Sequence, residues 1–277
     1  MIEDSPFIYD AGARDGIPIV FFHGFPGSHK QGALLVPVAE RMGLRVLAPD
    51  RPGYGYSKPM SSSEGLRGFI LSLERALDRL EITKFYLLGV SGGNPAAVCS
   101  AAHFGDRVLG LGSLCGLAPY PETRDLFYKF ARTGFDLARR TPDFVLRLTI
   151  NQLLKNFDPA LKLDLMMSKL SESDRAALSG DGVREAMFES MALARRQGAA
   201  GIIFDAKTAS APWPVDFAAI KCPYTLWHGT EDTVLPHSLS EYLHGRVSHS
   251  RLKLFAGEGH YSLAFGFTEE ILRDLVG

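Results

Sequence analysis

The fold is decided by the stretch Lys84–Gly105, which reads KFYLLGVSGGNPAAVCSAAHFG. It begins with a continuous apolar run, typical of a parallel strand that is covered on both faces, and it ends in a helical pattern. Between the two lies one serine, Ser91, with glycines at Gly89, Gly92 and Gly93. Such a turn either permits tight packing alone or holds the serine hydroxyl in place for chemistry.

Similar apolar runs alternate with helical patterns along most of the chain. Residues 64–81, for example, carry apolar side chains at steps of three and four, as an amphipathic helix does. The predicted strands are residues 18–24, 45–50, 84–90, 107–114, 224–229 and 251–257. Strands that alternate with helices predict an α/β fold with a doubly wound, mostly parallel sheet.

The alternation stops once, between residues 118 and 223, where no convincing strand is found. A structureless loop of this length is uncommon inside a compact domain. Helical patterns are found instead at residues 122–140, 143–156, 159–169 and 182–198. We therefore predict a helical cap at residues 119–212, inserted into a core that is formed by residues 1–118 and 213–277.

Composition narrows the range of partners. The 277 residues are enough for one large domain or one domain with an insertion, and the formal net charge is only −1. Acidic and basic residues are interspersed, so we expect neither a nucleic-acid partner nor a membrane partner. The acidic start MIEDSPFIYD lacks the apolar region of a signal peptide, and no apolar run approaches the ~18 residues of a membrane span. These features predict a cytoplasmic protein with a small-molecule substrate.

The three cysteines, Cys99, Cys115 and Cys222, each have apolar neighbours, and none has the spacing of a metal ligand. We expect buried, reduced thiols. The chain also lacks a phosphate-binding P-loop, a zinc-binding H-E-x-x-H motif and a complete dinucleotide fingerprint. The sequence therefore predicts neither a cofactor nor a metal.

Residues 89–93, GVSGG, fit the pattern G-x-S-x-G directly after a predicted buried strand and before a predicted helix. This setting gives the pattern its meaning, because small residues allow a sharp turn that exposes the serine. The helix N-terminus and the backbone N–H of Gly92 would then face negative charge that develops on a substrate oxygen. We predict that Ser91 is a nucleophile.

Its partners should follow in the order Ser, acid, His. His260 lies in the loop GEGHYS just after the last predicted strand, where parallel sheets hold their sites, and we predict it as the general base. The loop HGTEDTVLPH after the preceding strand offers Asp232, with Glu231 as a weaker rival. The predicted role of Asp232 is to fix the tautomer of His260 and to stabilise its imidazolium form.

Together these motifs resemble the α/β-hydrolase superfamily. The corresponding segments are HGFPGS (residues 23–28), DRPGYGYS (50–57), GVSGG (89–93), HGTEDTVLP (228–236) and GEGH (257–260). The resemblance implies an α/β-hydrolase fold whose cap is inserted between the sixth and seventh strands. It also implies that the backbone N–H of Phe25 joins that of Gly92 in an oxyanion hole. His23, Asp50 and Arg51 are then expected to support the site without reacting.

The chain also departs from the family pattern. Members usually have a longer β-hairpin before the motif that begins at His23, so we expect one edge strand to be absent. Haloalkane dehalogenases and epoxide hydrolases of this superfamily have aspartate at the position of Ser91, and dehalogenases tend to have tryptophan at that of Gly92. Neither activity is expected here.

The predicted function is a serine hydrolase that cleaves a carboxylic ester of a small to medium apolar molecule. A C–C bond hydrolase, lactonase, aminopeptidase or perhydrolase could use the same triad, and a low-turnover ligand-binding receptor or a non-catalytic scaffold stays open. An aminopeptidase would need cap acids such as Glu185 or Glu189. Aromatic residues of the cap either line an acyl pocket or pack the cap on the core: Phe127, Tyr128, Phe130 and Phe135. A homodimer through the cap or the sheet edge is a further open alternative.

Overall fold

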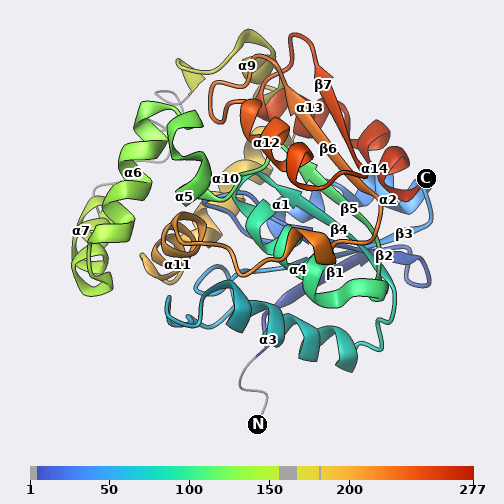
Figure 1. Ribbon diagram of the computed structural model, residues 1–277, viewed down its shortest axis with the longest axis horizontal. Coiled ribbons are helices and arrows are strands. Elements are labelled where there is room, and N and C mark those ends of the chain that lie inside the picture. Colours follow the sequence, from blue (N-terminus) through green and yellow to red (C-terminus); the bar gives the residue numbers. More distant parts are fainter. Residues whose placement is uncertain (1–4, 156–166, 181) are drawn as a thin grey trace.

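The computed structural model describes residues 5–155, 167–180 and 182–277. At its centre lies a seven-stranded sheet in the order β1-β3-β2-β4-β5-β6-β7 (Figure 1). The strands are β1 (Ile8–Gly12), β2 (Ile17–Phe22), β3 (Leu44–Pro49), β4 (Phe85–Val90), β5 (Val108–Leu114), β6 (Tyr224–Gly229) and β7 (Ser250–Phe255). All neighbouring strands run parallel except β1 and β3. The predicted mostly parallel α/β sheet is confirmed.

Six strands lie close to their predicted bounds, and β1 was not predicted. Its sequence IYDAG contains no apolar run, because the strand lies at the sheet edge and none of its residues is fully buried. It pairs antiparallel with β3, and Ile8 lies opposite Pro49. A half-exposed edge strand of this kind gives little sequence signal.

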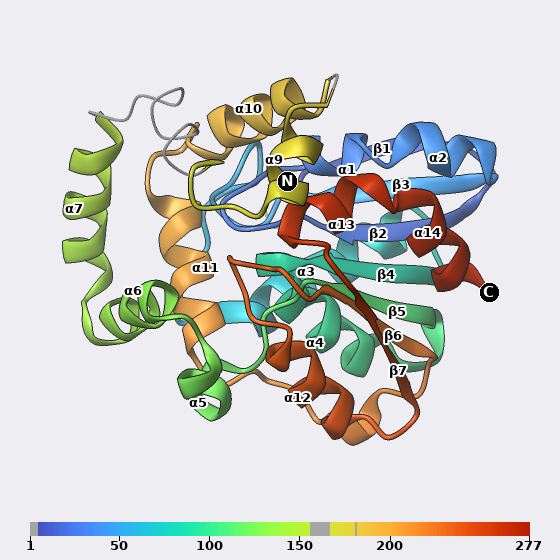
Figure 2. The ribbon, with the colours of Figure 1, turned by 90° about the horizontal axis from the view of Figure 1, so that it is seen from above.

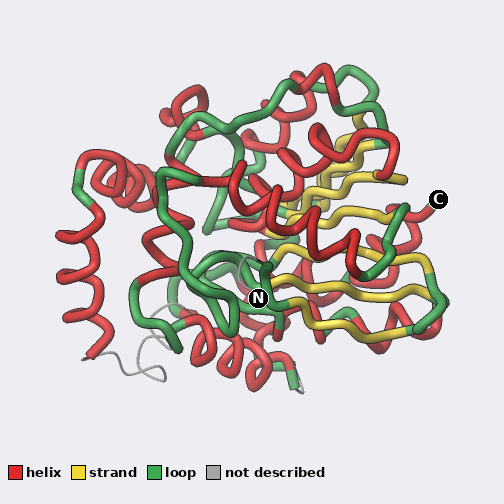
Figure 3. The backbone as a smooth tube through the Cα atoms, turned by 90° about the horizontal axis from the view of Figure 1, so that it is seen from below, coloured by secondary structure: helices red, strands yellow, loops and turns green. Residues whose placement is uncertain are grey.

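Helices cover both faces of the sheet (Figures 2 and 3). One face holds α3 (Gly65–Arg79), α4 (Asn94–Phe104) and α12 (Ser238–Arg246), and the other holds α1 (Lys30–Ala33), α2 (Val36–Arg41), α13 (His260–Gly266) and α14 (Thr268–Val276). Side chains alternate between the two faces along a strand: Val20 and Phe22 belong to one apolar core, and Ile19 and Phe21 belong to the other. The sheet is therefore doubly wound.

The helices between β5 and β6 form what we call the insertion. They are α5 (Tyr120–Thr123), α6 (Lys129–Arg140), α7 (Asp143–Lys155), α9 (Glu172–Leu178), α10 (Val183–Ala194) and α11 (Ala200–Ser210). They gather beyond one end of the sheet (Figure 2). Within the described ranges, no helix has both the length and the apolar character of a membrane span.

The position of the insertion needs a correction. In chain order it follows the fifth described strand and precedes the sixth, whereas the resemblance implied the sixth and seventh. The reason is that only β1 precedes β2 in the described residues, while the family count includes a longer N-terminal hairpin.

Only some helices of the insertion were predicted from the sequence. Helices α6, α7 and α10 were expected, whereas α9 and α11 were not, and most of the predicted helix 159–169 lies outside the described residues. Helix α11 is buried on several sides, so it lacks the amphipathic pattern that would identify it.

The three cysteines are free and buried, as expected. Burial raises the pKa of each thiol, that of Cys222 to about 11.

Candidate active site

Ser91 lies where β4 ends and a 3-10 turn (Ser91–Gly93) leads into α4. Its φ is 52°, in the left-handed region, which costs a residue with a side chain roughly 1–2 kcal/mol. The neighbouring glycines make this turn possible. A Cβ on Gly89 would lie 2.7 Å from Cβ of Ala97, and one on Gly93 would lie 2.6 Å from the carbonyl oxygen of His23. Strand, turn and helix therefore approach too closely for side chains at either position.

We expect Gly93→Ala to lower the free energy of unfolding by roughly 1–3 kcal/mol, because the added methyl group meets backbone atoms. Gly245→Ala is the matched control, since a Cβ there has no neighbour within 4 Å and the residue lies inside helix α12. The control should be neutral or stabilising by up to about 1 kcal/mol. Urea unfolding of both variants measures the difference, and equal stabilities would contradict this account of the turn.

The predicted oxyanion donors lie side by side. A Cβ on Gly92 would be 3.0 Å from the backbone nitrogen of Phe25, so the two backbones are in close contact beside Ser91. The loop that holds Phe25 is fixed from two directions. Oε1 of Gln31 accepts a hydrogen bond from the Gly24 N–H at 2.7 Å, and Arg51 donates to the carbonyl oxygens of His23 and Gly24.

Arg51 also joins this loop to the insertion. Its guanidinium forms a bidentate ion pair with Asp205 of α11, at 2.9 Å (Nε to Oδ1) and 2.5 Å (Nη2 to Oδ2). Both side chains are buried. Asp50 in turn accepts hydrogen bonds from the backbone N–H groups of His29 and Tyr56. Both residues thus make the supporting contacts expected of them. No sequence pattern pointed to Asp205, because α11 was not predicted.

Asp232 and His260 are joined directly. Oδ2 of Asp232 lies 2.7 Å from Nδ1 of His260 and 3.1 Å from Nε2 of His228. Oδ1 accepts from the backbone N–H groups of Val234 and Leu235, each at 2.8 Å. Burial works against the charge of Asp232, but the two histidines outweigh it and hold the pKa of this carboxyl well below its ordinary value. The rival acid, Glu231, is exposed.

His260 is a buried base with a raised pKa. Burial alone would lower that pKa, but the charge of Asp232, its hydrogen bond and the charge of Asp174 raise it above the ordinary 6.5. A general base must be neutral, so with His260 in its predicted role kcat/KM should fall as the pH drops through this raised pKa. We expect the midpoint of the acidic limb above pH 6.5 when kcat/KM is measured from pH 5 to 9. A midpoint at or below 6.5 would contradict this geometry.

Ser91, Gly92, Phe25 and His260 all line one cavity of about 750 Å³. No hydrogen bond joins Ser91 to His260 within the described contacts, as is common before a substrate binds. The other lining side chains are mostly apolar and come from both core and insertion; those of the insertion include Tyr128, Phe130, Phe135, Leu137, Leu170, Leu178, Met187 and Met191. The arrangement brings Ser91, His260, Phe25 and Gly92 to one mostly apolar chamber.

Three of the four aromatic residues singled out in the sequence therefore line the cavity, namely Tyr128, Phe130 and Phe135. Phe127 instead packs in the core against Tyr120. Tyr128 also contacts the loop that holds Asp232, since its hydroxyl donates to the backbone carbonyl of Asp232 at 2.8 Å.

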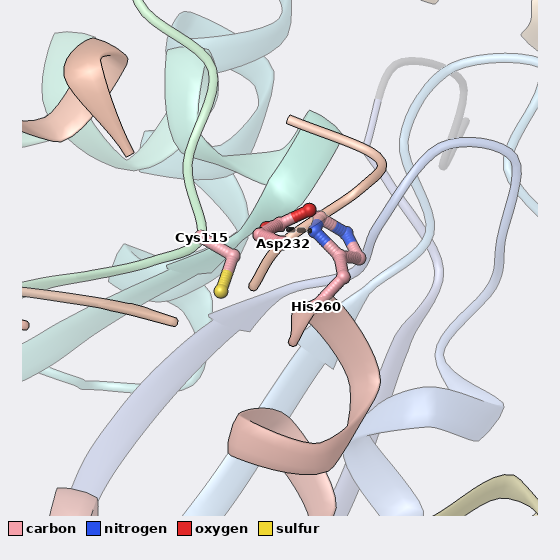
Figure 4. A group of neighbouring side chains, drawn as sticks. All are labelled: Cys115, Asp232 and His260. Carbon is pink, nitrogen blue, oxygen red and sulfur yellow. Dashed lines mark hydrogen bonds and ion pairs between the residues drawn. The ribbon is translucent and has the colours of Figure 1, made fainter. Parts of the chain in front are cut away.

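Figure 4 shows Cys115 beside Asp232 and His260. One ligand atom of each lies within 4.8 Å of the other two, and this is the one such group of three in the described residues. A metal would need a thiolate, but burial raises the pKa of the Cys115 thiol well above its ordinary value. Asp232 and His260 are also bonded to each other. The donor set therefore does not fit a metal centre.

Comparison with known proteins concerns the fold as a whole. A family model described as alpha/beta hydrolase fold matches residues 17–267. The 2-hydroxy-6-oxo-2,4-heptadienoate hydrolase of Pseudomonas putida is 28% identical over 258 residues, which cover 92% of this chain and 85% of that protein.

Two solved structures share the fold. An esterase from Exiguobacterium antarcticum has a TM-score of 0.71 at 18% identity, and the match covers 98% of this chain and 95% of the esterase chain. An enol-lactonase from Burkholderia xenovorans has a TM-score of 0.71 at 18% identity, and the match covers 98% of this chain and 96% of the lactonase chain. At such identities the likeness concerns the fold alone.

Proposed function

Because this chain belongs to the alpha/beta hydrolase fold family, we propose that it is a serine hydrolase that cleaves a carboxylic ester or related acyl bond. One observation carries the proposal. The strained Ser91, the adjacent Phe25 and Gly92, and His260 all line a single, mostly apolar cavity, and His260 is bonded to the buried Asp232 behind it.

The proposed reaction has two halves. His260 takes the proton of Ser91 through Nε2 while the serine oxygen attacks the carbonyl carbon. The N–H groups of Phe25 and Gly92 hold the oxyanion, and each such donor is worth roughly 3–4 kcal/mol in other serine hydrolases. His260 then gives the proton to the leaving alcohol, and water that it activates releases the acid from the acyl-enzyme. Asp232 keeps Nδ1 protonated throughout.

The lining of the cavity supports an apolar substrate of small to medium size. Its volume of about 750 Å³ lies in the usual range for a small-molecule site. Among the described lining residues, Lys169 and His260 are the ones that can carry a positive charge, and no carboxylate lines it. Glu185 and Glu189 do not line it either, and Glu189 bonds to Lys30. This lining does not favour an aminopeptidase.

The proposal is tested by intact-mass analysis after treatment with a fluorophosphonate probe. Wild-type protein should gain a single adduct, and Ser91→Ala should gain none. A panel of p-nitrophenyl esters with acyl chains of increasing length then measures the acyl preference of the cavity. If folded wild-type protein gains no adduct and hydrolyses no ester, the hydrolase proposal fails, and a ligand-binding receptor becomes the better description.

A second candidate is hydrolysis of a C–C bond by the same residues. It is favoured by the similarity to the 2-hydroxy-6-oxo-2,4-heptadienoate hydrolase, which extends over 92% of this chain. The two candidates differ in their preferred substrate, so kcat/KM for that dienoate should be compared with kcat/KM for the best ester. Dehalogenation is not proposed, because this chain has a serine at position 91.

A further inference from the structure

His260 is the first residue of α13, a helix whose opening N–H groups need acceptors from outside the helix. The residue before it, Gly259, stands at the N-cap and has no side chain that could accept them. Ser262 satisfies one of the N–H groups at this end of the helix, because its Oγ accepts a hydrogen bond from the Gly259 N–H at 2.8 Å. The N–H groups of residues 260–262 still require a partner.

That partner is a carboxylate from the insertion. Oδ2 of Asp174, on α9, accepts from the N–H of His260 at 3.0 Å, and Oδ1 accepts from Tyr261 at 2.7 Å and Ser262 at 2.8 Å. Asp174 is fully buried, with an exposed fraction of 0%. In the described part of the chain, no lysine or arginine lies within ion-pair distance of it. A buried carboxyl group is costly unless it is hydrogen-bonded, and these three bonds satisfy it.

The glycine before His260 fits the same contact. A Cβ on Gly259 would lie 2.5 Å from Oδ1 of Asp174, so the carboxylate occupies the space that any larger residue would need. Gly259 and Asp174, which lie 85 residues apart in the sequence, are therefore complementary in shape. Neither feature takes part in the reaction proposed above.

We propose that Asp174 is a positioning residue through which the insertion holds His260 in its working place and stabilises its imidazolium form. The positive end of a helix disfavours a cation at its first residue, and a carboxylate bound to the same N–H groups offsets that effect. The inference rests on the proposed function, in which His260 becomes charged each time Ser91 loses its proton. Asp174 does not itself line the cavity.

The test compares Asp174→Asn with Glu172→Gln, which removes an exposed carboxylate from the same helix. We expect Asp174→Asn to lower kcat for the best ester roughly 10- to 100-fold, with KM unchanged within about twofold. The acidic limb of kcat/KM should move to lower pH, because a negative charge beside His260 is lost. Among the described residues, the titratable groups that face His260 from neighbouring elements are Asp232, Asp174 and Cys115, and only Asp174 is changed. Glu172→Gln should match the wild type.

A second measurement does not depend on activity. Hydrogen–deuterium exchange at the amides of residues 260–262 should be faster in Asp174→Asn than in wild type, and unchanged in Glu172→Gln. Gly259→Ala should reproduce the faster exchange, because it displaces the same carboxylate. Unchanged exchange in Asp174→Asn would overturn the inference even if the enzyme is active, and so would a fall in kcat without a shift of the acidic limb. If the wild type has no activity, the proposed function fails. The contact between Asp174 and the amides of residues 260–262 is then tested by the exchange result alone.

Discussion

Ser91→Ala should lower kcat for the best ester by about six orders of magnitude, close to the loss seen when the nucleophile is removed from another serine hydrolase. In the proposed mechanism the serine, His260 and Asp232 act as one unit, so the expected loss is large because alanine leaves the base with nothing to activate. The oxyanion donors stay in place, so a residual rate of about 10³- to 10⁴-fold over water is expected. Steady-state kinetics on protein purified over unused resin measures the loss.

The control for this variant is Ser91→Gly. Both variants remove the hydroxyl, but only glycine adopts the left-handed conformation at φ 52° without strain. Ser91→Gly should therefore be more stable than Ser91→Ala by about 1 kcal/mol while being equally inactive. Substantial ester hydrolysis by either variant would mean that Ser91 is not the nucleophile.

Asp232→Asn should lower kcat by about four orders of magnitude while leaving the fold intact. An asparagine amide can donate to Nδ1 of His260, which favours the tautomer whose Nε2 is protonated and unable to accept the proton of Ser91. The backbone N–H groups of Val234 and Leu235 bond to Oδ1 at 2.8 Å, so they hold the new amide oxygen there and place the amide nitrogen at the Oδ2 position, facing His260. Kinetics at several pH values, with circular dichroism as a check of folding, measures the effect.

Glu231→Gln is the matched control, since it changes the neighbouring, exposed carboxylate by the same chemistry. Its kcat should equal that of the wild type. If the two variants lost activity in the reverse order, the acid of the triad would be Glu231, and the hydrogen bond between Asp232 and His260 would need another explanation.

The parts of the molecule that could be predicted from the sequence are those with local signals. The strand before Ser91, the glycines around it and the loops that hold Asp232 and His260 are each encoded within about ten neighbouring residues, and the fold brings them to one edge of the sheet. Strand β1 and helix α11 were missed for opposite reasons: the first is too exposed to show an apolar run, and the second is too buried to show an amphipathic one.

Asp174 and Asp205 could not be assigned roles from the sequence, because nothing near either of them marks its partner. Asp174 bonds to residues 86 to 88 positions further along the chain, and Asp205 pairs with Arg51, 154 positions before it. Such contacts depend on how the insertion packs on the core, and a single sequence gives no signal for that packing. The substrate preference of the cavity depends on the same packing.

The ion pair between Arg51 and Asp205 limits how freely the helices of the insertion can be exchanged between relatives, in evolution or in a designed chimera. Arg51 is part of the core and is buried, so a donor insertion without an acid at the Asp205 position would leave an uncompensated cation, at a cost of about 3–5 kcal/mol. The same donor must also bring a carboxylate to the amides of residues 260–262. A transplanted insertion therefore has to match the core at both carboxylates before the shape of its cavity matters.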